Sequence, residues 1–155
     1  MLMVKNIYKS YSSGNSVNDV IVDVSLDIKS SDIVCIVGPS GSGKSTIINM
    51  LGSLLKPDRG EIFMNDKNIY TDKNIYKLRR ETIGLLFQNH YLLPEFNVIE
   101  NLLIPTYLVD RDEELCRNTI KKHLSNLGLE DKLFSYPHQL SGGELQRVAL
   151  IRSII

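Results

Sequence analysis

The sequence lacks an excess of charge of either sign, and this limits the partners that it can attract. Eighteen lysine and arginine residues offset eighteen aspartate and glutamate residues, so the formal net charge is zero. A neutral chain has no strong overall field that draws it to nucleic acid or to an anionic lipid surface. We therefore expect no nucleic-acid partner, and we interpret the pairs Arg79–Arg80 and Lys121–Lys122 as solvated helix faces.

Cysteines and long apolar runs are also scarce. The two cysteines, Cys35 and Cys116, lie far apart and form no CxxC pair, which argues against a disulfide framework or a metal site and fits a reducing cytosol. Cys35 lies in an apolar run, so we expect it to be a buried small hydrophobic residue. The N-terminal residues lack the apolar core of a signal peptide, and no apolar stretch reaches the roughly 18 residues that span a bilayer. Any link to a membrane is expected to come through a partner.

The first half of the chain has the pattern of an α/β protein, and its 155 residues suffice for one domain with a real core. Alternation predicts strands over Leu2–Ile7 and Val20–Ile28, joined by a polar turn or loop over Ser10–Asn18. Val22, Val24, Leu26 and Ile28 are expected on one face of the second strand. The β-branched run Ile33–Val37 is typical of a parallel strand buried on both faces. The further expected elements are a helix at Lys44–Leu55, a turn at Lys56–Gly60, and short strands at Glu61–Asn65 and Thr82–Phe87.

The pattern becomes helical after Gln88. Helices are predicted over Val98–Leu103, Glu113–Leu127 and Asp131–Phe134, separated by Pro94, Pro105, Gly128 and Pro137. We interpret this stretch as a helical insertion of about fifty residues and not as an independent domain. A last helix is predicted to begin near Ser141.

A glycine-rich stretch between the predicted strand at Ile33–Val37 and the helix after it indicates nucleotide binding. The stretch reads Gly38-Pro39-Ser40-Gly41-Ser42-Gly43-Lys44-Ser45 and fits the phosphate-loop pattern G-x-x-x-x-G-K-[ST]. Glycines let successive backbone N–H groups turn inward around a phosphate, and the start of the helix adds its positive dipole end. We expect Lys44 to reach the β- and γ-phosphates of ATP, Ser45 to ligate Mg²⁺, and Thr46 to contact the α-phosphate. The alternative, an accidental Gly- and Ser-rich turn, is disfavoured by the strand–loop–helix context.

A second motif narrows the class of phosphate-loop protein. The sequence Leu140-Ser141-Gly142-Gly143-Glu144, continuing Leu145-Gln146-Arg147-Val148-Ala149, resembles the signature of ABC ATPases. Physically it is another anion site, with Ser141 as the N-cap of a helix and backbone N–H groups exposed at Gly142 and Gly143. The resemblance implies that this motif contacts the γ-phosphate of ATP held by a second subunit. A Ser-Gly-Gly tripeptide alone could be a plain helix cap, but the phosphate loop in the right order before it disfavours that alternative.

The resemblance covers essentially the whole chain and implies an ABC ATPase fold: a phosphate-loop NTPase with an antiparallel β subdomain and a helical insertion subdomain at about residues 89–140. It implies that Gln88 is the catalytic Q-loop glutamine, touching Mg²⁺ or the attacking water; the alternative is a polar surface residue. Tyr11 would be the stacking platform for adenine, with Tyr8 as its competitor and packing on the sheet edge as the alternative.

One stretch suggests a subfamily. The residues Gln88–Phe96, followed by Glu100-Asn101, resemble the ATP-binding subunits of lipoprotein-releasing and macrolide-export systems. The resemblance implies that the chain forms a homodimer or pairs with another ABC subunit. It also implies that the chain lies on the cytoplasmic face of the cell membrane, bound to integral membrane permease subunits through the exposed aromatics of this stretch. The alternative is that the stretch belongs to the core of the helical subdomain.

Three motifs that family members carry after the signature do not appear: an apolar strand ending in Asp-Glu, an Asp loop and a His switch. The nearest match, Leu108–Glu113, precedes the signature and opens a helix with acidic residues. His90, His123 and His138 also precede the signature helix, so we expect them to be surface or core residues. We therefore expect the sequence to be the first part of a longer ATPase, with an incomplete core sheet and without hydrolysis by these 155 residues alone. The alternatives are a non-hydrolysing nucleotide-binding fragment and a soluble ABC ATPase that drives no transport.

Overall fold

The computed structural model of the chain describes residues 1–14, 16–71, 73, 75–108 and 112–155. The chain divides into two compact units, Met1–Arg79 and Arg80–Ile155, and each is described here by itself. None of the helices in these described ranges is long and apolar enough to cross a membrane.

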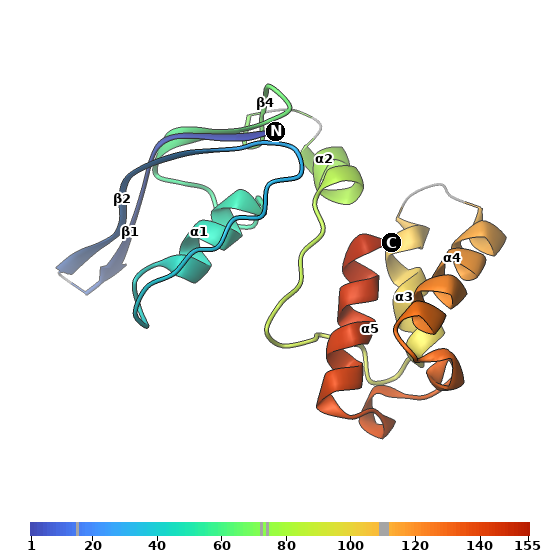
Figure 1. The fold of residues 1–155 in the computed structure, drawn as a ribbon. Coiled ribbons are helices and arrows are strands. Elements are labelled where there is room, and N and C mark those ends of the chain that lie inside the picture. The colour runs from blue at the N-terminus through green and yellow to red at the C-terminus, as the bar shows by residue number, and fades with distance from the viewer. Residues whose placement is uncertain (15, 72, 74, 109–111) are drawn as a thin grey trace. The chain divides into compact units, whose positions relative to one another are not determined.

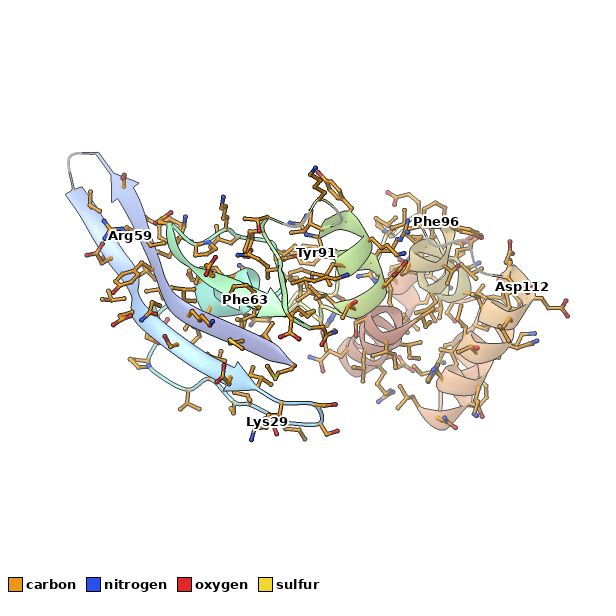
Figure 2. All side chains as sticks on the ribbon, turned by 90° about the horizontal axis from the view of Figure 1, so that it is seen from above. Lys29, Arg59, Phe63, Tyr91, Phe96 and Asp112 are labelled. Atoms are coloured by element: carbon orange, nitrogen blue, oxygen red, sulfur yellow. The ribbon has the colours of Figure 1, made fainter. Side chains whose placement is uncertain are left out.

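A four-stranded antiparallel sheet and one helix make up the core of the N-terminal unit (Figure 1). The strands are β1 (Leu2–Ser13), β2 (Ser16–Ile28), β3 (Arg59–Met64) and β4 (Lys67–Asn68), in the order β2-β1-β3-β4. Arg59 and Phe63 mark the course of β3 in Figure 2. The helix α1 (Lys44–Leu51) buries Met50 against apolar side chains of the sheet. The buried members of this core are Val4, Ile7, Ile21, Met50, Ile62 and Ile69.

The hairpin of β1 and β2 is longer than expected, so the predicted loop over Ser10–Asn18 is wrong. Strand β1 continues to Ser13 and β2 begins at Ser16, with Tyr11 paired to Asn18. The polar side chains that suggested a loop bond across the strands instead: the Ser10 hydroxyl donates to Asp19 Oδ1 at 2.6 Å. Exposed strand ends tolerate such polar pairs because their side chains face water on both sides.

The expected apolar face of β2 is interrupted by a bulge. Asn6 and Asp23 have positive φ values of 46° and 52°, and the Asn6 side-chain amide donates to Asp23 Oδ1 at 2.7 Å. The pairing register shifts here, and an extra residue in a strand reverses which side chains face the core. Ile21 is therefore buried and Val22 is 59% exposed, so the placement of Val22 with Val24, Leu26 and Ile28 is wrong.

The expected strand at Ile33–Val37 is not formed. This run is neither helix nor strand, Ile33 is 98% exposed and Cys35 is exposed, so the predictions of a buried strand and a buried Cys35 are wrong. A parallel strand exists only through hydrogen bonds to its neighbours, and none of the described strands pairs with this run.

The helix α1 ends at Leu51 and not at Leu55. Ser53 takes a left-handed φ of 59°, and the backbone N–H groups of Leu54 and Leu55 both donate to Asn49 O, at 2.8 and 3.1 Å. The Arg79 guanidinium donates to Ser53 Oγ at 2.7 Å and to the Ser53 carbonyl. Arg79 is therefore a buttress of this turn and not the solvated side chain that we expected.

The boundary between the two units lies within α2 (Ile75–Thr82). Thr82 ends this helix, and residues 83–87 form neither helix nor strand, so the strand predicted at Thr82–Phe87 is wrong. This segment requires a glycine at position 84, because an added Cβ would lie 2.1 Å from the Ser153 carbonyl oxygen. A close approach of two backbones replaces strand pairing here.

Three helices form the core of the C-terminal unit: α3 (Val98–Tyr107), α4 (Glu113–Asn126) and α5 (Gly142–Ile154). The short 3₁₀ turns η1 (Glu130–Lys132) and η2 (Pro137–Gln139) connect α4 to α5. Figure 1 shows the three helices side by side, and their apolar faces meet in one cluster. The fully buried members of this cluster include Leu102, Leu103, Ile120, Leu124, Leu129, Val148 and Ile151.

The predicted helices of this unit are largely confirmed. Asp112 caps α4 by accepting the Leu115 N–H at 2.9 Å, as the acidic start of that helix suggested; residues 109–111 of the stretch Leu108–Glu113 lie outside the described residues. The first helix runs past Pro105, where we expected a break, because a proline in the last turn removes only one amide donor. The helix predicted at Asp131–Phe134 is the single 3₁₀ turn η1. Lys121 and Lys122 are exposed, as expected.

Candidate functional site

The glycine-rich loop lies against the β-hairpin of the N-terminal unit. Gly43, which precedes α1, has a left-handed φ of 86°, and an added Cβ would lie 2.7 Å from Ile21 Cδ1 and 3.1 Å from Val20 O. A side chain at this position would therefore push the loop off β2. At Gly41, with a φ of 80°, an added Cβ would meet no atom within 4 Å, so that side of the loop is open.

Lys44 turns back over the loop that precedes it. Its ammonium donates to Gly38 O at 3.0 Å and to Pro39 O at 2.6 Å. The loop is also braced by the Ser42 N–H, which donates to Pro39 O at 3.3 Å. A positive charge is thereby held within the turn formed by residues 38–43.

The first backbone N–H groups of α1 have no side-chain cap and can donate to a ligand. The N-cap is Gly43, which has no side chain to accept a hydrogen bond, and the first turn holds no acidic residue. Uncapped N–H groups and the positive end of the helix dipole together form an anion site. The Lys44 ammonium adds a full charge to it, so the donor set fits the phosphates of a nucleotide.

Beside the loop is a hollow of about 480 Å³. Its lining residues come from the hairpin, the loop and the helix: Tyr11, Val20, Ser40, Gly41, Gly43, Lys44, Ser45 and Thr46. The structure thus brings together most of the residues that the motif predicted for one nucleotide, and Gly38, Pro39 and Ser42 complete the loop. Sequence reasoning missed Val20, because an apolar residue in a strand carries no signal of ligand contact.

Tyr11 and Tyr8 differ in their surroundings. Tyr11 lines the hollow, is 44% exposed, and has the Lys9 ammonium 5.9 Å from its ring centroid. Tyr8 instead lies beneath Arg59, whose guanidinium carbon is 6.0 Å from the ring centroid. Desolvation and the neighbouring Asp23 carboxylate raise the pKa of Tyr8. Tyr11 therefore has the open aromatic face that a base requires.

The hydroxyl of Ser45 is the candidate protein ligand for a divalent cation here. Ser45 is exposed in the first turn of α1 and lines the hollow. Mg²⁺ takes six oxygen ligands and commonly uses phosphate oxygens and waters together with one or two protein groups. The hydroxyl of Ser45 fits that donor set.

The signature stretch of the C-terminal unit begins α5 with a capping box. Ser141 is the N-cap: Glu144 N–H donates to Ser141 Oγ at 3.4 Å, and Ser141 N–H donates to Glu144 Oε2 at 2.7 Å. The N-cap prediction for Ser141 is confirmed. Gly142 and Gly143 follow as exposed residues of the first turn, so their backbone is open to a ligand.

Glu144 and Lys132 were not singled out from the sequence. Besides the capping bond, Glu144 Oε2 accepts the Ser141 hydroxyl at 2.7 Å, and the Lys132 ammonium is 4.0 Å from Glu144 Oε1. The Ser141 hydrogen bonds and the nearby Lys132 and Arg147 charges lower the pKa of Glu144. The pattern S-x-x-E is a known capping signal, so the contact between Ser141 and Glu144 was available from the sequence.

Gln88 lies beside α5 in the same unit. It is exposed and lines a hollow of about 610 Å³ together with Gly143, Gln146 and Arg147. The apolar rest of the lining consists of Leu86, Phe87 and Leu150. The phosphate loop belongs to the other unit, so the expected role of Gln88 at Mg²⁺ stays a prediction.

The segment that follows Gln88 is held by two buttresses. Arg152 of α5 donates to His90 O at 2.6 Å and to Tyr91 O at 2.7 Å. The fully buried Asn101 of α3 accepts the Leu93 N–H at 2.8 Å and donates to Leu93 O at 3.0 Å and Phe96 O at 2.8 Å.

The aromatic residues of this segment remain on the surface of the unit. Tyr91 is 64% exposed and Phe96 is 42% exposed, and both are labelled in Figure 2. The Tyr91 ring also meets Phe87 edge to face, with 5.4 Å between the ring centroids. The segment thus presents aromatic side chains on a backbone that Arg152 and Asn101 hold in place.

Known proteins resemble this chain over its whole length. The family model described as "ABC transporter" matches residues 21–155. The lipoprotein-releasing system ATP-binding protein LolD of Myxococcus xanthus is 38% identical, over all of this chain and 70% of the relative. LolD of Cytophaga hutchinsonii is 41% identical with the same two coverages. Among solved structures, the ATP-binding cassette MJ0796, as a dimer in a post-hydrolysis state bound to ADP and Pi, matches with a TM-score of 0.90 and 36% identity over 99% of this chain and 69% of that one.

Proposed function

This chain belongs to the ABC transporter family as an ATP-binding subunit, and we propose that its Gly38–Ser45 loop binds ATP with Mg²⁺ to drive the release of lipoproteins. The observation that carries the proposal is the Lys44 ammonium, which two loop carbonyls hold at the uncapped start of α1. ATP and an ATPase activity are properties of the family; the residue roles, the metal, the partners and the cargo are our proposal.

Each residue around the hollow has a role that follows from its chemistry. The backbone N–H groups of residues 38–43 and the Lys44 ammonium hold the β- and γ-phosphates. Thr46 donates to the α-phosphate, and Tyr11 stacks on the adenine. The hydroxyl of Ser45 would ligate Mg²⁺. The metal, when bound, neutralises charge that develops on the transferred phosphoryl group.

The second half of the site comes from another copy of the chain or from a paired ABC subunit. Ser141 and the exposed N–H groups of Gly142 and Gly143 form an anion site at the start of α5. Placed on the γ-phosphate of ATP held by the partner, they make hydrolysis depend on association. The dimeric state named for MJ0796 supports this reading. Gln88 would contact Mg²⁺ or the attacking water and would sense whether the γ-phosphate is present.

The membrane side of the proposal rests on the relatives and on the segment Tyr91–Phe96. Both named LolD relatives belong to lipoprotein-releasing systems. The exposed rings of Tyr91 and Phe96 provide apolar contact area for a permease subunit. The chain then acts at the inner face of the membrane, and the permease supplies the path for the lipoprotein.

The proposal is tested first by nucleotide binding. Lys44→Ala should weaken the affinity for Mg-ATP by about tenfold to a hundredfold, because charge-assisted hydrogen bonds to phosphate are worth about 1.5–3 kcal/mol. Lys56→Ala, which removes an exposed lysine outside the hollow, is the matched control and should bind as the unchanged protein does. Equal affinities in a fluorescent-nucleotide titration of both variants would contradict a nucleotide site at this loop.

Two further measurements test the metal and the cargo. Ser45→Ala should reduce the gain in ATP affinity that Mg²⁺ provides, and it should leave binding in EDTA unchanged.

Isolation of the protein from membranes should recover integral membrane subunits, and vesicles holding that complex should release lipoprotein on addition of ATP. A complex that hydrolyses ATP and releases no lipoprotein would contradict the proposed cargo.

A further inference from the structure

We propose that Glu144 regulates the signature half of the ATP site by orienting the Ser141 hydroxyl away from the γ-phosphate. Lys132 weakens this effect by partly neutralising the charge of Glu144. The inference rests on the proposed function, in which Ser141 contacts ATP bound by a second chain. Glu144 is thus a positioning residue that acts through Ser141.

The first step concerns the proton of the serine hydroxyl. Ser141 Oγ and Glu144 Oε2 are 2.7 Å apart. An ionised carboxylate only accepts hydrogen bonds, and a serine hydroxyl has a single proton. That proton therefore points at Glu144, and Ser141 Oγ presents lone pairs in other directions.

The second step concerns what a phosphate would meet. The γ-phosphate oxygens are acceptors, as are the free lone pairs of Ser141 Oγ. Ser141 can donate to ATP only after its hydroxyl rotates away from Glu144 Oε2. Glu144 keeps its second bond, from the Ser141 backbone N–H at 2.7 Å, so the helix cap survives this rotation.

The third step concerns charge. Glu144 places a negative charge one helical turn from the start of α5, close to where the γ-phosphate would bind. The Lys132 ammonium is 4.0 Å from Glu144 Oε1 and is shared with Asp131 Oδ2 at 3.0 Å. Arg147 is a second cation, three residues after Glu144 on the same helix, and its Nη1 lies near Gly143, where an added Cβ would be 4.0 Å away. These two cations lower the repulsion between Glu144 and a triphosphate without removing it.

The substitution Glu144→Gln tests the charge of this residue independently of its role in the helix cap. A glutamine side chain completes the same capping box, but it carries no charge and holds the Ser141 hydroxyl less strongly. Glu144→Gln should therefore preserve α5 and ease the γ-phosphate contact. Alanine would remove both functions and is the less informative change.

The experiment measures the concentration of ATPγS, a slowly hydrolysed ATP analogue, that gives half-maximal dimer by light scattering. Glu144→Gln should lower this concentration about two- to fivefold, the range expected for a partly screened charge interaction. Lys132→Ala should raise it, and should have little effect when combined with Glu144→Gln. Binding of a fluorescent ADP, which has no γ-phosphate, should not change. Glu114→Gln, an equal charge change at an exposed site on α4, should leave every value unchanged.

The outcomes separate this inference from the function on which it rests. If Ser141→Ala raises the half-maximal concentration and Glu144→Gln leaves it unchanged or raises it, the role of Glu144 is wrong and the composite site stands. An equal change in ADP binding would also overturn the role, because the effect would not concern the γ-phosphate. If the unchanged protein forms no dimer with ATPγS, the proposed composite site is wrong and the role of Glu144 falls with it.

Discussion

At the scale of single residues, two glycines of the phosphate loop differ in how much free space surrounds them. Gly41 and Gly43 both have left-handed φ values, but only Gly43 has neighbours that an added Cβ would meet. Gly41→Ala should cost about 1 kcal/mol of stability from backbone strain alone. Gly43→Ala should cost more, about 2–4 kcal/mol, because the loop must also leave Ile21 and Val20. Chemical unfolding of both variants would measure this, and equal costs would contradict the packing of the loop on β2.

Tyr70 provides a pH-dependent contribution at the far end of α1. Its hydroxyl lies 2.5 Å from both Met50 O and Leu55 O, and burial raises the pKa of Tyr70 to about 12. Because the folded pKa exceeds the usual value of 10.0, this contribution is complete below pH 10 and is lost as the pH rises from 10 to 12.

The stability of the Tyr70→Phe variant isolates this contribution. The variant should be less stable than the unchanged protein by about 1 kcal/mol at neutral pH. Its stability should also fall less between pH 10 and pH 12. Parallel pH curves for the two proteins, measured by urea unfolding, would contradict a stabilising contribution from the protonated Tyr70 hydroxyl.

Residue-level prediction from the sequence worked where chemistry is local. Ser141 was predicted as an N-cap because the cap depends on neighbours within one helical turn, and the structure has it there. Val22 was misplaced because the bulge at Asn6 and Asp23 depends on pairing between two strands. The Arg79 bond to Ser53 joins residues 26 positions apart, which no local pattern encodes.

At the scale of elements, the segment from His90 to Phe96 depends on two helices that follow it in the chain, α3 and α5. Asn101 of α3 satisfies backbone groups of Leu93 and Phe96, and Arg152 of α5 satisfies carbonyls of His90 and Tyr91. Both bonds join side chains of the helical core to an exposed backbone. The surface that presents Tyr91 and Phe96 is thus fixed by residues that a partner would not touch directly.

Asn101→Ala should loosen this segment. We expect a loss of about 2–3 kcal/mol, because the fully buried Asn101 side chain makes several hydrogen bonds to the backbone of Leu93 and Phe96 that alanine cannot make. We also expect faster amide exchange at Leu93. Asn126→Ala, at the exposed end of α4, is the control and should change neither quantity. Unchanged protection of the Leu93 amide in the Asn101 variant would show that α3 does not hold the segment.

Helices were predicted better than strands in this chain, for a physical reason. The predicted Glu113–Leu127 helix nearly coincides with α4, and the α5 start coincides with the signature, because apolar spacing and caps act within one helix. The runs Ile33–Val37 and Thr82–Phe87 have strand composition without strand structure, because a strand needs a partner whose position the run itself does not specify. The break predicted at Pro105 is also wrong, because a proline in the last turn of a helix does not end that helix.

At the scale of the whole molecule, the two units carry different parts of the proposed site. The N-terminal unit has the phosphate loop, Tyr11 and the hollow between them, and the C-terminal unit has the signature and Gln88. Each has its own apolar core. Sequence motifs predicted both parts because glycine-rich anion sites are written in short contiguous stretches. The backbone contacts of Arg152 and Asn101 emerged only from the structure.

The central claim is that one ATP is held by the loop of one chain and the signature of another, and mixing two variants tests it directly. Lys44→Ala weakens phosphate binding at the loop, Ser141→Ala weakens it at the signature, and neither variant alone should dimerise normally with ATPγS. A mixed dimer contains one site with both changes and one site with neither, so mixing should restore ATP-dependent association about halfway. Restoration by mixing is the result that we predict. Association that stays as weak in the mixture as in either variant alone would contradict a site shared between two chains.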